Sequence, residues 1–65
     1  MEAKIIELLR ARPMEDGMMY ERLSGPNPDW TAGFVAFLRT LSAMKRAGIV
    51  TVKNVGWNTY VWKLA

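Results

Sequence analysis

The chain has 65 residues, with nine Lys or Arg, six Asp or Glu, and no His or Cys. This length allows one domain, residues 1–65, whose apolar side chains are needed for a single small core. Without Cys there is no disulfide or thiolate site, and without His the commonest general base and metal ligand are absent. We therefore expect no enzyme activity, no cofactor and no bound metal.

The first predicted helix spans residues 2–12. Ile5, Leu8 and Leu9 recur at helical spacing and share one face. Pro13 is expected to end the helix, because the residue before a proline disfavours helical geometry.

The second predicted helix is short and spans residues 18–24. Asp16 is expected to cap its start, and Gly25 to occupy the left-handed position after its end. Met19 is expected to face the core, whereas Tyr20 is expected at the surface.

The third predicted helix is the longest and runs from Pro28 to about Ala47. Asn27 is expected as its N-cap, and Gly48 as the residue that ends it. The face predicted to point to the core carries Trp30, Phe34, Phe37, Leu38, Leu41 and Met44. The opposite face carries Ala32, Val35, Ala36, Arg39, Ala43 and Arg46.

After Gly48 the pattern changes to that of a β-hairpin. Residues 49–53 are β-branched apart from a final Lys and predict a strand; residues 59–64 predict the returning strand. Residues 54–58 contain Gly and two Asn, so we expect a loop of four or five residues between the strands.

Charge is distributed unevenly along the chain. Residues 1–30 hold all six acidic side chains and four basic ones, a net charge of −2. Residues 31–65 hold five basic side chains and no acidic one, a net charge of +5. A positively charged surface attracts polyanions, of which nucleic acid is the usual one.

Three helices followed by a two-stranded hairpin, within about this length, resemble the winged helix-turn-helix superfamily of DNA-binding domains. The segment from Leu41 to Val50 is similar to the end of the recognition helix and the start of the wing in many bacterial and archaeal regulators. The segment from Asp16 to Leu23 resembles the entry into the second helix of that fold. The resemblance implies an α+β, mostly α, winged-helix domain with a C-terminal two-stranded wing.

The resemblance also implies a function, the binding of double-stranded DNA by a small transcriptional regulator from a prokaryote, phage or virus. The third helix would lie in the major groove, and the hairpin would touch the backbone or the minor groove. The candidate contacts are Thr31, Ala32, Val35, Ala36, Arg39, Arg46, Lys53, Asn54, Trp57 and Asn58. Arg39 is expected to be the most important of them, and a homodimer is expected to extend the interface.

Other interpretations remain open. The scaffold could serve as a protein-interaction module that uses the apolar outer face of the third helix and Trp57, or as an RNA-binding accessory domain. Trp57 could stack on a sugar or base, contact a partner, or fold back over the sheet. The sequence shows no signal peptide and no apolar stretch long enough to span a bilayer, so we expect a cytoplasmic protein without membrane contact.

Overall fold

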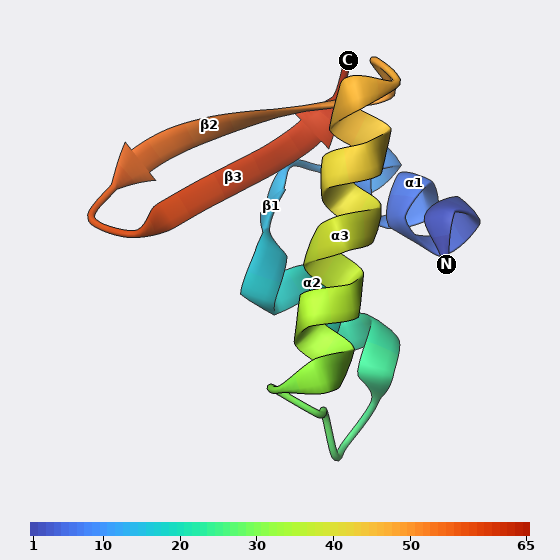
Figure 1. Ribbon diagram of the computed structural model, residues 1–65. Helices are drawn as coiled ribbons and strands as arrows, with labels where there is room; N and C mark the ends of the chain where they lie inside the picture. Colours follow the sequence, from blue (N-terminus) through green and yellow to red (C-terminus); the bar gives the residue numbers. More distant parts are fainter.

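The computed structural model describes all residues, 1–65, as a mostly helical α+β fold (Figure 1). The elements are α1 (Glu2–Ala11), β1 (Met14–Glu15), α2 (Asp16–Ser24), α3 (Ala32–Arg46), β2 (Val50–Gly56) and β3 (Thr59–Leu64). The strands form one antiparallel sheet in the order β1-β3-β2. The predicted three helices and hairpin are confirmed, and the layout is compatible with that of a winged helix.

The predicted two-stranded hairpin is part of a sheet with a third strand, β1, which the sequence analysis did not predict. After α1 the chain is extended, and Met14 pairs with Trp62 while Glu15 pairs with Val61. Met14 is buried by this pairing. A strand of two residues has no pattern of its own, and it forms because β3 offers free backbone groups beside it.

The helix α2 begins at Asp16, with Glu15 as its N-cap. Asp16 does not cap the helix as predicted, because its carboxylate accepts a hydrogen bond from the adjacent amide of Gly17 at 2.7 Å. Gly25 follows the helix with φ 81° and ψ −158°. Its φ is positive, as glycine allows, but its ψ lies outside the left-handed helical region that was predicted for this residue.

The helix α3 begins at Ala32, later than the predicted Pro28. Asp29, rather than Asn27, accepts the hydrogen bonds of the first turn. Its carboxylate accepts from the amide of Thr31 at 2.9 Å, from the Thr31 hydroxyl at 2.5 Å and from the amide of Gly33 at 3.2 Å. Its carbonyl oxygen accepts from the amide of Phe34 at 3.0 Å.

The end of α3 turns the chain directly into β2. The amide of Gly48 donates to the carbonyl of Lys45 at 3.0 Å, and the amide of Ile49 donates to that of Met44 at 2.9 Å. This pair of bonds is a Schellman motif, which needs a left-handed residue at the glycine position. Gly48 has φ 78°, so its predicted role is confirmed.

The hairpin is longer and its turn tighter than predicted. The turn has two residues, Trp57 and Asn58, and Asn58 has a positive φ of 53°. A β-bulge between Asn54 and Gly56 accommodates Val55, which has no partner on β3. The amide of Gly56 donates a hydrogen bond to the Asn54 side chain at 3.0 Å. Figure 1 shows the hairpin projecting from the C-terminal end of α3, away from the helices.

The core is made by apolar side chains from every element. Phe37, Leu41 and Met44 bury the predicted inner face of α3, and Leu38 on this face is half-buried. Trp30 lies outside the helix and is 47% exposed, so its predicted place in the core was wrong. The buried residues are Ile5, Leu9, Met14, Met19, Tyr20, Phe37, Leu41, Met44, Val50 and Trp62. No buried side chain is charged, so all charged groups are left for the surface.

Candidate nucleic-acid interface

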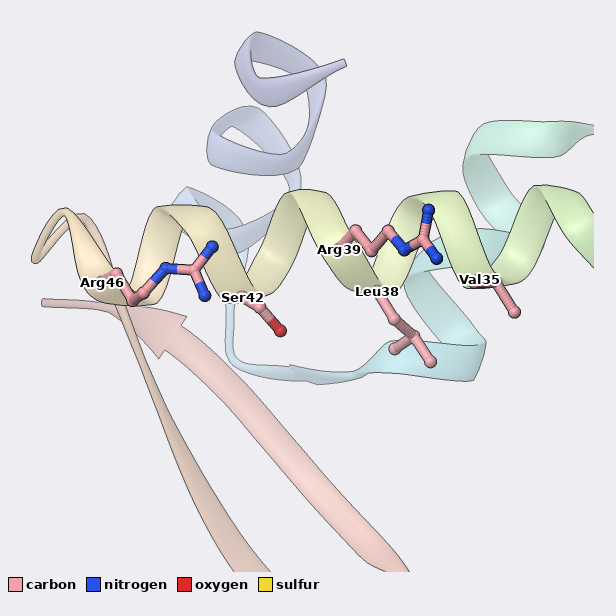
Figure 2. Close-up of a pocket in the computed structure, with 5 residues that line it drawn as sticks. All are labelled: Val35, Leu38, Arg39, Ser42 and Arg46. Atoms are coloured by element: carbon pink, nitrogen blue, oxygen red, sulfur yellow. The ribbon is translucent and has the colours of Figure 1, made fainter.

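The outward side of α3 carries an open groove of about 470 Å³. It is lined by Val35, Leu38, Arg39, Ser42 and Arg46 (Figure 2). Val35, Arg39, Ser42 and Arg46 recur every three or four residues and form one stripe along the helix, with Leu38 beside it. We call this surface the α3 groove.

Two arginines dominate the polar side of the α3 groove. Arg39 and Arg46 are separated by seven residues, a rise of about 10 Å along the helix axis. Figure 2 shows them on either side of the small Ser42. Both are exposed, and neither takes part in a side-chain hydrogen bond. Their guanidinium donors are therefore free for an anionic ligand.

Small side chains continue the exposed face of α3 toward its start. Ala32 and Ala36 are both exposed, one turn apart. Alanine extends little beyond the helix backbone, so a flat or grooved partner can approach this part of α3 closely. The helix carries no acidic residue along its length.

Just before α3, hydrogen bonds stabilise the ionised form of the Asp29 carboxyl. The hydrogen bond from the Thr31 side chain lowers the pKa of this carboxyl, and the amides of Thr31 and Gly33 lower that pKa further. Because the Thr31 hydroxyl donates its only hydrogen to Asp29, it can offer a ligand nothing but acceptor lone pairs. Thr31 can therefore accept a hydrogen bond from a base, but it cannot donate one to a phosphate.

The sheet places Lys53 away from the α3 groove. Val52 pairs with the buried Trp62, and successive side chains on a strand point to opposite faces. Lys53 therefore lies on the outer face of the sheet, the one without the core. A groove of about 210 Å³ on that face is lined by Pro13, Thr51, Lys53, Val55, Val61 and Lys63.

The turn of the hairpin presents Trp57 almost completely to solvent. Its side chain is 92% exposed, so it does not fold back over the sheet. Val55, in the adjoining bulge, is 53% exposed. We call residues 55–58 the hairpin tip.

All ten candidate contact residues are exposed, but they belong to separate surfaces. Val35, Arg39 and Arg46 share the α3 groove, whereas Lys53 lines the groove on the outer face of the sheet. Trp57 and Asn58 form the turn at the hairpin tip.

The ten candidate residues include three of the five that line the α3 groove and only Lys53 of the six that line the groove on the outer face of the sheet. Leu38 was assigned wholly to the core, and Ser42 was not singled out although it lies at helical spacing between the two arginines. Lys63 lines the outer sheet groove, and its pairing with Thr51 depends on a register that only the structure gives.

No model of a known protein family matches the chain, and neither a curated protein nor a solved structure gives a significant match. No helix in the structure combines the length and apolar character needed to cross a membrane. No three acidic side chains gather into a group that could hold a metal ion. The surfaces described above are therefore what bears on the function of the protein.

Proposed function

We propose that the protein is a winged-helix domain that binds double-stranded DNA and regulates transcription by occupying its site. In this arrangement α3 enters the major groove, and the β2–β3 hairpin is the wing that touches the backbone or minor groove. The order α1-β1-α2-α3-β2-β3 and the antiparallel sheet are compatible with that layout.

The α3 groove is the observation that carries the proposal. Arg39 and Arg46 lie two helical turns apart on a face without acidic residues, and their donors are unoccupied. The major groove is about 12 Å wide and admits one helix. A guanidinium can bind guanine through two hydrogen bonds or bind a phosphate, so this stripe suits both kinds of contact.

The charge of the chain favours the same partner. All five basic side chains of residues 31–65 are exposed, and no acidic residue lies between Thr31 and the C-terminus. Asp29 is the one carboxylate next to α3. It would oppose a phosphate at the N-terminal end of the helix, so we place the charged contacts to DNA at Arg39 and further along α3.

The decisive experiment is a titration of a labelled mixed-sequence duplex with the protein, followed by fluorescence anisotropy at about 50 and about 200 mM salt. Each phosphate contact lowers log affinity by about 0.9 per tenfold rise in salt, so three to five contacts give a slope of about −3 to −4.5. A folded protein that leaves the anisotropy unchanged at the lower salt concentration contradicts the proposal.

The exposed apolar side chains favour a second candidate, a winged-helix module that binds another protein. Val35 is 47% exposed on α3, and Trp57 is 92% exposed at the hairpin tip. The same titration separates the two functions. A module that binds another protein through these side chains does not require DNA, and any binding that they support should depend little on salt.

A further inference from the structure

The hairpin tip differs from the other aromatic positions in the chain. Trp62 is 7% exposed and Trp30 is 47% exposed, whereas Trp57 is 92% exposed. The indole of Trp57 therefore has almost no protein neighbours. A binding partner of this indole would therefore belong to another molecule.

Strand pairing and hydrogen bonds close the turn that carries Trp57. Gly56 pairs with Thr59 across the turn, and the Thr59 hydroxyl donates to the carbonyl of Trp57 at 3.1 Å. The bulge is closed by the hydrogen bond from Gly56 to Asn54. A large flat ring is thus presented on a narrow turn that is closed by hydrogen bonds.

The tip also stands clear of the rest of the sheet. The strand β1 pairs with β3 only at Val61 and Trp62. Between Val61 and the turn, the hairpin is therefore a two-stranded ribbon without a third strand. Figure 1 shows this end of the hairpin pointing away from all three helices.

We propose that Trp57 is a wedge that enters the minor groove and stacks into a deformable base step; this inference rests on the proposed DNA binding. The minor groove is about 6 Å wide. Two strands about 4.8 Å apart, together with their side chains, do not fit into it, but a single planar ring does. Apolar wedges of this kind partly unstack a step and kink the duplex.

The wedge would give sequence preference without a hydrogen bond to a base. Pyrimidine–purine steps such as TA and CA unstack most easily, so inserting a ring there costs least. Trp57 would select such steps beside the site read by α3. Asn58, on the same turn, offers an amide for the polar groups that line the groove.

The size of the tip argues against a protein as its partner. Val55 and Trp57 are its only apolar side chains, and one tryptophan buries at most about 250 Å². A stable protein interface buries about 800 Å² on each partner. The charge near the tip is positive, since Lys53 lies on β2 and no acidic residue lies on either strand of the hairpin.

The test compares two duplexes of equal length by anisotropy, one with central TA and CA steps and one with a homopurine strand, which has no such step. The wild-type protein should bind the first at least about fivefold more tightly, the lower end expected for one aromatic–base stack. Trp57→Ala should bind both duplexes alike, with the wild-type affinity for the homopurine duplex. Trp57→Phe should keep part of the preference.

Val55→Ala is the matched control, because it removes an exposed apolar side chain from the same tip and should keep the full preference. Equal wild-type affinity for the two duplexes overturns the wedge while the proposed DNA binding stands. An equal loss of affinity for both duplexes in Trp57→Ala also overturns it, since Trp57 would then be a general contact. Failure of the wild-type protein to bind either duplex overturns both proposals.

Discussion

The hydroxyl of Tyr20 in α2 donates a hydrogen bond of 2.6 Å to the backbone carbonyl of Asp29, just before α3 begins. Tyr20 is 6% exposed, and its ring packs against Trp30, Phe34 and Phe37 at centroid separations of 5.2 to 5.4 Å. One side chain thus joins α2, the connecting loop and the first half of α3. It sets where the proposed recognition helix starts.

Tyr20→Phe is expected to destabilise the fold by about 0.5–1.5 kcal/mol, the usual contribution of one neutral hydrogen bond. The ring and its aromatic contacts remain, so the loss reports the bond to Asp29 alone. Urea unfolding followed by circular dichroism measures it. Tyr60→Phe is the control, because the Tyr60 hydroxyl makes no hydrogen bond within the protein and is expected to give wild-type stability.

Gly33→Ala is expected to destabilise the protein, although alanine is favoured over glycine within helices by about 1 kcal/mol. A Cβ at this position would overlap the Tyr20 hydroxyl and stand 3.2 Å from the Cβ of Asp29. The overlap lies in the partly buried junction of α2 and α3, where the ring cannot move aside without breaking its bond to Asp29.

A double-mutant cycle identifies the cause of that loss. In the Tyr20→Phe background the hydroxyl is gone, so Gly33→Ala should cost clearly less than in the wild-type protein. An equal cost in the two backgrounds would contradict the overlap. Gly17→Ala is the control, since nothing lies within 4 Å of a Cβ there, and its stability should equal or exceed that of the wild type.

Asp29→Asn is expected to lower stability at pH 7, and the deficit should shrink in acid. Hydrogen bonds from Thr31 and Gly33 hold the pKa of the Asp29 carboxyl below its ordinary value. A carboxyl with a folded pKa below the unfolded one stabilises the fold above the unfolded pKa, about 3.9. That contribution is lost as the pH falls through the folded pKa.

Urea unfolding between pH 7 and pH 2.5 measures this dependence. The wild-type and Asp29→Asn curves should begin to approach each other at about pH 4, where the unfolded carboxyl becomes protonated, and should meet only below the lowered pKa of the folded carboxyl. Glu21→Gln is the control for the change of net charge, because Glu21 is exposed and accepts no hydrogen bond. If the loss of stability in Asp29→Asn stays constant with pH, the negative charge of Asp29 is not what stabilises the start of α3.

The features that could be predicted from the sequence are those set by local pattern. Helical spacing correctly predicted that Phe37, Leu41 and Met44 lie on the buried face of α3, and Gly48 correctly predicted where that helix ends. The same spacing placed Arg39 and Arg46 together on the exposed face. These results depend on residues within a few turns of each other, whose relative positions the helix itself fixes.

The features that were missed depend on contacts between distant parts of the chain. The strand β1 exists because Met14 meets Trp62, far along the sequence. Tyr20 is buried, not exposed as predicted, because the aromatic side chains around the start of α3 close over it. That contact, with the bonds to Asp29, also moves the start of α3 to Ala32, and no local signal shows it.

The two arginines of the α3 groove are expected to contribute differently to DNA binding. If Arg46 binds a phosphate, Arg46→Ala lowers affinity for all sequences alike and reduces the salt slope by about 0.9. If Arg39 reads guanine through two hydrogen bonds, Arg39→Ala reduces discrimination at one base pair by about 1–3 kcal/mol. Anisotropy titrations at two salt concentrations, on the preferred site and on single-base variants of it, separate these effects.

The control is Arg10→Ala, which removes the same charge from the exposed surface of α1. Its loss should leave the salt slope and the base preference unchanged, because α1 lies outside the proposed interface. A reduction in slope as large as that of Arg46→Ala would mean that total charge, and not the geometry of the α3 groove, governs binding. Loss of affinity confined to Arg39→Ala and Arg46→Ala would instead locate the duplex along α3, with the hairpin free to reach the adjacent minor groove.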